Sequence, residues 1–278
     1  MFGVGVGVRV GGFTASGGVA PYVGLLDVYP GASAAYSVRL LRTAYTGNAI
    51  RVRRTDLTES NIGFTSAGNL DTAALLAFTG TGALDNGFIT TWYDQSGNAK
   101  NLTQTTAVNQ PQIVSAGSVI NLNGKPYINY LSSGLSALST SATFSITTAL
   151  EIFSVQKRTN TSLNYLYDWG TNRSASFYNP DLIIFGGASL ASGDTSANQT
   201  LQTHLFNGAT SKVLKNNTLL VTGNAGSNGA SGSFFLGTRQ SSDFNLIGGF
   251  QEFIIYPSNQ SANESGINTN INTYYAIY

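Results

Sequence analysis

Alternating hydrophobic and polar positions predict short β-strands along most of the chain. From about residue 110 onward, segments such as TALEIFSVQKR (148–158), TLQTHLFNG (200–208) and GGFQEFIIYP (248–257) carry this pattern, with turns rich in Gly, Ser and Asn between them. Side chains two residues apart lie on the same face of a strand, so alternation indicates strands with one face toward a core. Strands that recur every dozen or so residues predict an all-β, two-sheet sandwich of jelly-roll type.

Three segments depart from this period and predict short helices. GASAAYSVRLLRTAY (31–45) places Ala35, Val38 and Leu41 at helical spacing, and NLDTAALLAFTG (69–80) has Asp71 where a carboxylate can cap a helix. The third segment is the C-terminal one, SANESGINTNINTYYAIY. We therefore expect helices near the start of the sandwich and one that closes it.

The first residues form a separate Gly/Val-rich arm in this interpretation, with the sandwich spanning 25–278. GVGVGVRV (3–10) alternates at the period of a strand, but glycine leaves half of its positions without side chains. We expect this arm, residues 1–24, to be flexible or to pair with the edge of another subunit. The expected assembly is a homo-oligomer, a trimer, attached through the arm to other structural proteins.

Composition excludes several classes of function. The chain has 14 basic and 13 acidic residues in 278, a net charge of +1, so it has no field to attract nucleic acid or an anionic membrane. It has no cysteine, which excludes disulfides and thiolate metal sites, and its single histidine, His204, lies in a strand pattern that favours a structural role. We expect no cofactor, no metal and no membrane span, because no apolar run approaches about 20 residues.

Five arginines fall in a short span that contains no acidic residue. The simplest interpretation is a solvated helix face that runs into a strand, with the arginine stems covering apolar surface; a phosphate or partner contact is the alternative. The five are Arg39, Arg42, Arg51, Arg53 and Arg54.

A polar cluster in residues 90–104, TTWYDQSGNAKNLTQ, could form either a functional site or a structural corner that holds the fold together. Asp94 and Ser96 can accept hydrogen bonds from the backbone of their own turn, and Gly97 can take a positive φ. Trp92 and Tyr93 point to opposite faces, so only one of them need lie in the core. We interpret the stretch as a structural corner, with a sugar contact as the alternative.

Several motifs together resemble the catalytic domain of α-L-arabinofuranosidase B. The resemblance rests on LLDVYPGASAAYSVRLLRTAYTGNAIRVRR (25–54) and ITTWYDQSGNAKNLTQ (89–104), and then on YLYDWG (165–170), DLIIFGG (181–187) and FFLGTRQSSDFN (234–245). It implies a concanavalin-A-like jelly roll. The Tyr-Asp-Gln-Ser-Gly core is also similar to that of lectin-like modules in phage tail and spike proteins.

The resemblance also implies where catalytic residues would fall. A retaining glycosidase uses two carboxyl groups about 5–5.5 Å apart. The family's nucleophilic Glu falls at Asp181, and its acid/base Asp falls at Ser241, with Asp243 two residues away. The cysteine pair that lines the family's pocket corresponds to Tyr165 and Leu166. These changes predict loss of catalysis, with Asp181 and Asp243 as degenerate candidates.

Sugar binding would then be the capability that remains. The candidate carbohydrate-binding residues are Tyr165, Asp168, Trp169 and Asp181, because they surround the strand end where the family holds its sugar. Composition typical of an extracellular β protein, without an export signal or disulfides, fits a virion component released by lysis. We therefore expect a non-enzymatic glycan-binding module on a virion surface or outside the cell. The alternative is an α-L-arabinofuranosidase-like retaining glycoside hydrolase.

Overall fold

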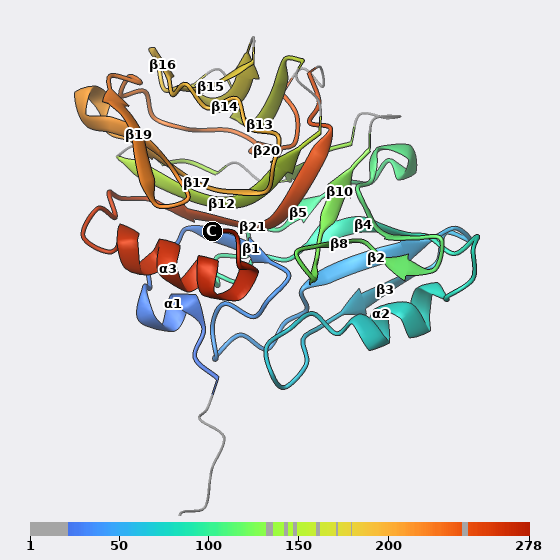
Figure 1. Ribbon diagram of the computed structural model, residues 1–278. Helices are drawn as coiled ribbons and strands as arrows, with labels where there is room; N and C mark the ends of the chain where they lie inside the picture. Colours follow the sequence, from blue (N-terminus) through green and yellow to red (C-terminus); the bar gives the residue numbers. More distant parts are fainter. Residues whose placement is uncertain are drawn as a thin grey trace, which may run out of the picture.

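The computed structural model describes residues 22–131, 136–141, 144–146, 149–159, 162–170, 172–178, 180–240 and 244–278. Within them, nineteen strands pair into one antiparallel network that folds over itself, and a two-stranded hairpin stands apart. The predicted all-β sandwich with few short helices is confirmed (Figure 1).

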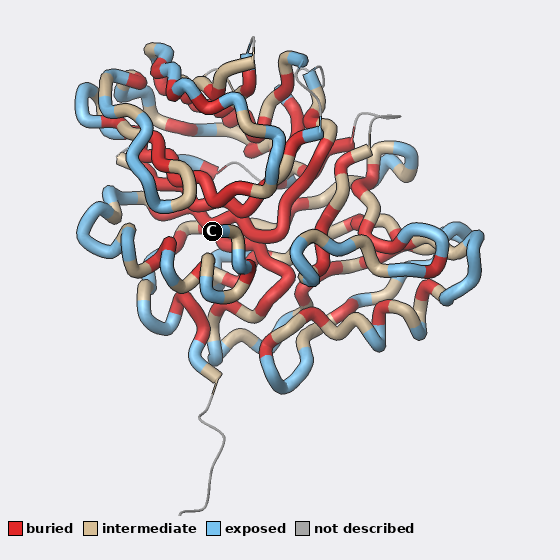
Figure 2. The backbone as a smooth tube through the Cα atoms, in the orientation of Figure 1, coloured by how far each residue is buried: buried red, intermediate tan, exposed pale blue. Residues whose placement is uncertain are grey.

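One layer is built around two long central strands. The strands of this layer, in spatial order, are β1 (Ala34–Ser37), β21 (Gly248–Tyr256), β12 (Leu150–Arg158), β17 (Thr200–Phe206), β18 (Ser211–Lys215) and β19 (Thr218–Gly223). Residues of β21 and β12 are buried along almost their whole length, including polar ones such as Glu151, Gln156 and Glu252, because other elements cover both faces of these central strands (Figure 2).

The second layer runs across the other side of the core. Its strands, in spatial order, are β16 (Ser189–Ala191), β15 (Asp181–Phe185), β14 (Arg173–Tyr178), β13 (Asn164–Trp169), β20 (Phe235–Leu236), β11 (Leu138–Thr140), β5 (Leu102–Thr103), β4 (Gly87–Trp92), β2 (Ile50–Arg54) and β3 (Glu59–Ile62). Aromatic rings join the two layers: Tyr167 of β13 packs edge-on against Phe253 of β21, with ring centroids 5.4 Å apart.

Short strands connect the layers at one end. β10 (Ile128–Tyr130) pairs with both β21 and β6 (Gln112–Ser115), and β6 in turn pairs with β4 and with β7 (Ser118–Val119). The separate hairpin is formed by β8 (Asn121–Leu122) and β9 (Lys125–Pro126). Two 3-10 turns, Ala107–Asn109 and Gly208–Thr210, complete the regular structure of the described residues.

The helices confirm two predictions and correct one. α2 (Thr72–Thr79) begins where predicted, with the Asp71 carboxylate accepting a hydrogen bond from Ala74 N at 2.9 Å, and α3 (Glu264–Tyr275) closes the chain. The predicted helix over 31–45 is wrong: this segment holds β1, which pairs with β21, and a further helix, α1 (Leu25–Val28), lies just before it. β1 is buried on all sides, so the helical spacing of its apolar residues did not mark one exposed and one buried face.

The corner after β4 is structural, as predicted. Asp94 Oδ1 accepts hydrogen bonds from the backbone N–H groups of Ala35 and Ser96, both at 2.9 Å, and Gly97 has a φ of +96°. Gln95 is fully buried, and its Oε1 accepts from Leu41 N at 2.7 Å. The corner therefore holds the irregular chain around β1 in place, because it supplies hydrogen-bond partners that no strand provides there.

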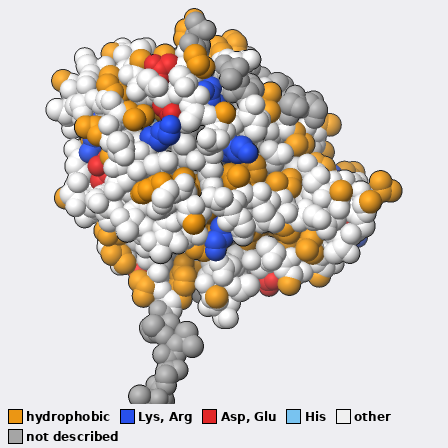
Figure 3. Space-filling view, in the orientation of Figure 1, with side chains coloured by type: hydrophobic (Ala, Val, Ile, Leu, Met, Phe, Trp, Pro, Cys, Tyr) orange, Lys and Arg blue, Asp and Glu red, His pale blue; other side chains and the backbone are white. Residues whose placement is uncertain are grey.

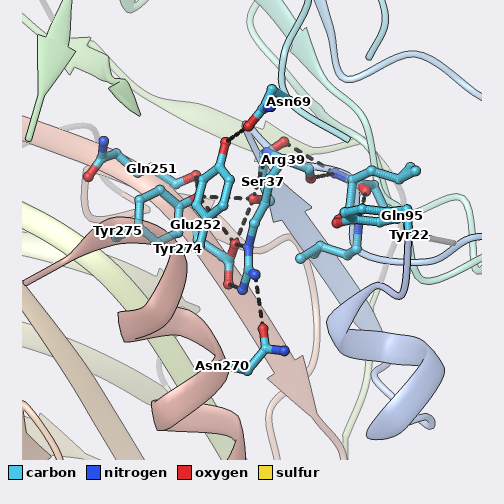
Figure 4. A network of polar contacts seen from close by, with 12 residues as sticks. Tyr22, Ser37, Arg39, Asn69, Gln95, Gln251, Glu252, Asn270, Tyr274 and Tyr275 are labelled. Carbon is cyan, nitrogen blue, oxygen red and sulfur yellow. Dashed lines mark hydrogen bonds and ion pairs between the residues drawn. The ribbon is translucent and has the colours of Figure 1, made fainter. Parts of the chain in front are cut away.

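The prediction of a solvated arginine face holds only in part: Arg51 and Arg54 are partly exposed, whereas Arg39 and Arg53 are buried. Arg39 is buried, and its guanidinium makes two hydrogen bonds of 2.7 and 2.9 Å to the Glu252 carboxylate of β21, with a third to Asn270 of α3 (Figure 4). Burial opposes the charged form of Arg39, but the adjacent Glu252 carboxylate raises its pKa overall. Arg53 is also buried and donates to Gln110 Oε1 at 2.6 Å. The acids and amides that satisfy these cations come from distant parts of the chain.

The surface is consistent with the low charge of the sequence. On the face in Figure 3, charged side chains are sparse and of both signs. Among the described residues, no helix is long and apolar enough to cross a membrane. The predicted N-terminal arm, apart from its last residues, lies outside the described residues.

Candidate active site

A cavity of about 460 Å³ lies on one face of the β13–β16 part of the second layer. Its volume lies in the range typical of small-molecule sites. Its lining combines aromatic and aliphatic side chains with serine hydroxyls, and it includes two residues of the chain that follows β20. The lining residues are Leu163, Tyr165, Ser174, Ser176, Tyr178, Ile183, Phe185, Ser189, Arg239 and Phe244.

Strand register explains why these residues share one face. Tyr165 of β13 pairs with Ser176 of β14, and Ser176 pairs with Ile183 of β15. Residues directly opposite each other in adjacent strands project to the same side of a sheet. The alternate residues, such as Phe177 and Ile184, are buried and project toward the core.

Asp181 lies at the edge of this cavity face. It is the first residue of β15 and pairs with Tyr178, so its side chain shares the face of Tyr178 and Ile183, which both line the cavity. Asp181 is partly exposed, and its Oδ1 atom is buried without a hydrogen-bond partner among the described residues. A buried carboxylate oxygen without a donor is unfavourable in a resting protein, and a bound hydroxyl or water would satisfy it.

Asp168 lies on the same face but at its other end. A bulge between Tyr165 and Tyr167 shifts the alternation of β13, so that Asp168 pairs with Ser174, a residue of the cavity wall. The Asp168 carboxylate is buried and accepts a hydrogen bond from Gln240 N at 2.8 Å. It thereby anchors the chain segment that borders the cavity.

Asp168 and Asp181 cannot serve as a catalytic pair with each other. Their partners on β14, Ser174 and Tyr178, are four residues apart, which corresponds to about 13 Å along a strand at roughly 3.3 Å per residue. Retaining glycosidases need carboxyl groups about 5–5.5 Å apart, and inverting ones about 6.5–9.5 Å. A partner for Asp181 must therefore come from another segment.

Trp169 is a core residue, which corrects its prediction as a sugar contact. Its side chain is 0% exposed, its ring packs against Phe144 and Phe234 at 4.4 and 5.2 Å between centroids, and its Nε1 donates to Phe144 O at 2.8 Å. Both ring faces are therefore unavailable to a sugar. The bulge in β13 places Trp169 on the core side, and alternation in the sequence does not reveal a bulge.

The remaining residues that the family resemblance singled out differ in where the structure places them. Tyr165 lines the cavity, and its role in sugar binding stays a prediction. Leu166, at the second position of the family's cysteine pair, is buried in the core. Ser241 and Asp243 lie outside the described residues, but Arg239 and Phe244 on either side of them both line the cavity.

Two aromatic residues of the cavity were missed by sequence reasoning. Tyr178 could have been found from the alternation of β14, because it shares the period of Ser174 and Ser176. Phe244 lies in a turn-like segment whose geometry leaves no periodic signal. Its φ of +56° is unusual for a bulky residue and is visible only in the structure.

His204 has the structural role expected for it. It is fully buried on β17, and its Nδ1 lies 2.8 Å from the Tyr167 hydroxyl, within hydrogen-bond distance. Burial lowers the pKa of His204 to about 3, so the ring stays neutral. Among the described residues, no three His, Cys, Asp or Glu side chains are grouped so as to hold a metal ion.

The sequence of part of both strand layers matches a known family. The family model described as "Alpha-L-arabinofuranosidase B, catalytic" matches residues 27–176, which is more than half of the chain. The chain belongs to the α-L-arabinofuranosidase B catalytic-domain family. No curated protein matches it.

Solved arabinofuranosidases share the fold. A GH54 α-L-arabinofuranosidase soaked with a cyclic sulfate inhibitor superposes with a TM-score of 0.64 at 18% identity, and an arabinofuranosidase complexed with arabinofuranosyl-α-1,2-xylobiose superposes with 0.62 at 19%. Each match covers 86% of this chain and 62% of the other protein. This chain therefore spans less than two thirds of the length of those enzymes.

Family membership overturns the functional prediction made from the sequence. The chain was expected to be a non-enzymatic virion or appendage module, yet its relatives are glycoside hydrolases. The resemblance to phage lectin-like modules has no support from these comparisons. The prediction gave too much weight to individual substituted positions and too little to the family resemblance of the whole segment.

Proposed function

We propose that the protein is a glycoside hydrolase that removes α-L-arabinofuranosyl residues from glycans. Family membership supports the reaction class, and the observation that carries the proposal for this chain is the cavity beside Asp181. The cavity presents aromatic surface and serine hydroxyls, the combination that binds the apolar faces and hydroxyl groups of a sugar. The glycan partner expected from the sequence would then be the substrate.

Asp181 supplies one of the two carboxyl groups in this proposal. Its carboxylate attacks the anomeric carbon while a second acid protonates the departing glycosidic oxygen, and water then releases the sugar and regenerates Asp181. Aspartate is one methylene shorter than the family's glutamate, so the sugar must lie closer to β15. Asp243 is the candidate second acid, because its segment joins two residues of the cavity wall.

The proposal is tested by turnover of 4-nitrophenyl α-L-arabinofuranoside and of arabinan by the purified chain. We expect Asp181→Asn and Asp243→Asn each to lower kcat by at least about 100-fold, since positioned acid–base catalysis contributes roughly 10²–10⁴-fold. Asp56→Asn is the matched control, because Asp56 is exposed and pairs with Arg54 at the β2–β3 turn. Absence of turnover in the parent chain, or turnover unaffected by both variants, would refute the assignment.

A further inference from the structure

Two aromatic rings of the cavity wall are exposed to solvent. Tyr178 is 57% exposed and Phe244 is 41% exposed, and both line the cavity. Tyr178 pairs with Asp181 across the β14–β15 hairpin, whereas Phe244 lies beside Tyr165 of β13. Tyr178 lies on β14 two residues beyond Ser176, the partner of Tyr165, so the two rings belong to different positions of the cavity wall, one beside Asp181 and one beside Tyr165.

The backbone holds Phe244 in an unfavourable conformation. A φ of +56° brings the Cβ atom of an L-residue close to its own backbone, and glycine is the residue that adopts it without cost. The Phe244 carbonyl accepts a hydrogen bond from Tyr165 N at 2.8 Å, which ties this conformation to β13. Unfavourable backbone conformations of this kind cluster at ligand-binding and catalytic positions.

Neighbouring groups fix the orientation of the surface around Phe244. The Tyr165 ring lies 6.4 Å from the Phe244 ring with 32° between their planes, and the Arg239 guanidinium lies 5.8 Å from the Tyr165 ring. Tyr165 is thus in contact with both Arg239 and Phe244 in the cavity wall. An exposed Phe beside these groups offers a flat apolar surface and no hydrogen bond, which suits stacking against the C–H face of a sugar.

We propose that Phe244 and Tyr178 form a stacking platform for the leaving-group side of the substrate, so that the protein selects oligo- and polysaccharides over small arabinofuranosides. This inference rests on the proposed function, because the leaving group is the part of the glycan that the proposed hydrolysis releases. A single arabinofuranosyl unit near Asp181 can contact one ring, whereas a longer glycan can contact both. Binding energy from sugars remote from the reacting bond then contributes to catalysis.

The test compares a small substrate with a longer one. We expect Phe244→Ala and Tyr178→Ala to raise KM for a longer arabino-oligosaccharide by about tenfold each, as expected for loss of one well-packed aromatic contact. KM for 4-nitrophenyl α-L-arabinofuranoside should change much less. Tyr278→Ala is the control, since Tyr278 is an exposed aromatic at the chain terminus, outside the cavity lining.

A glycine variant separates binding from folding. Phe244→Gly removes the ring but also relieves the positive-φ conformation, so it should be at least as stable as Phe244→Ala while binding the oligosaccharide as weakly. Phe244→Tyr should restore binding. If Phe244 served only to pack the loop, stability would fall in both ring-deleting variants and the KM ratio of the two substrates would stay constant, which would overturn the inference.

A direct measurement of binding affinity distinguishes failure of the stacking platform from failure of the proposed hydrolase activity. The affinity of the Asp181→Asn chain for the longer arabino-oligosaccharide is measured by calorimetry, alone and combined with Phe244→Ala or Tyr178→Ala. Binding that both ring deletions weaken, in a parent chain without turnover, would support the platform and refute the hydrolase. An absence of oligosaccharide binding, or binding that neither deletion weakens, would refute the platform.

Discussion

Replacing Glu151 by Gln should remove a pH dependence of stability that is built into the core. Glu151 of β12 is fully buried beside the start of α3. Its Oε2 accepts a hydrogen bond from Gln260 N at 2.5 Å, and its carboxyl group lies beside the Glu264 carboxyl of α3. Lys212 of β18 lies 2.7 Å from Glu264 and is the cation of this cluster. Two carboxyl groups thus share a site with one lysine.

Burial, followed by the interaction with the adjacent Glu264 carboxyl, raises the pKa of Glu151 from its ordinary 4.5 to about 8. A carboxyl group whose pKa is raised in the folded protein stabilises the fold when protonated, and this contribution is lost as the pH rises through the folded pKa. Each pKa unit corresponds to about 1.4 kcal/mol, so the shift sets an upper limit of about 5 kcal/mol. The loss should fall between about pH 5 and pH 8.

Urea unfolding of the parent and of Glu151→Gln across this range measures the effect. We expect the free energy of unfolding of the parent to fall with rising pH, and that of the variant to change little, because the amide cannot ionise and can still accept from Gln260 N. Above about pH 8 the variant should be the more stable protein. Glu59→Gln, a change at an accessible acid paired with Arg51, is the control. A parent whose stability is constant or rises from pH 5 to pH 8 would show that the reasoning is wrong.

Two further predictions concern the scaffold and the N-terminal arm. Gln95→Ala should lower the free energy of unfolding by about 2–3 kcal/mol, because it leaves the buried Leu41 N–H and the carbonyls of Ser37 and Arg39 without their partner. Denaturant titration measures this loss. An unchanged unfolding midpoint would contradict the structural role of the corner. Deleting residues 2–18 should leave the sandwich folded but abolish assembly, which sedimentation would show as a shift to monomer. A truncated chain that assembles normally would remove that idea.

Patterns in the sequence predicted correctly the elements whose structure depends on neighbouring residues. Alternation identified β12, β17 and β21, and the Asp71 cap located the start of α2. The segment 31–45 was mistaken for a helix because burial on all sides produces apolar positions at every spacing. Its strand state depends on the free edge of β21, which lies more than 200 residues away in the sequence.

The candidate site was less predictable, because its geometry depends on irregularities. The bulge in β13 exchanges the faces of Asp168 and Trp169 relative to simple alternation, so an acid of the cavity face and a core tryptophan could not be told apart. Arg39 was read as a solvated cation because Glu252 is remote in the sequence. Phe244 carried no signal, since a positive φ is a property of the folded backbone.

The region that identifies the family and the region that forms the cavity overlap only in part. The matched residues, 27–176, include Asp94 and Gln95, whose side chains satisfy buried backbone N–H groups of Ala35 and Leu41. A substitution there leaves donors or acceptors unpaired in the core, so these positions tolerate little change. Asp181, Arg239 and Phe244 follow the matched region and line or border an accessible cavity, where a changed side chain meets water or ligand instead. The corner thus constrains the fold, while the later strands and the segment around Phe244 can change without leaving backbone groups of the core unpaired.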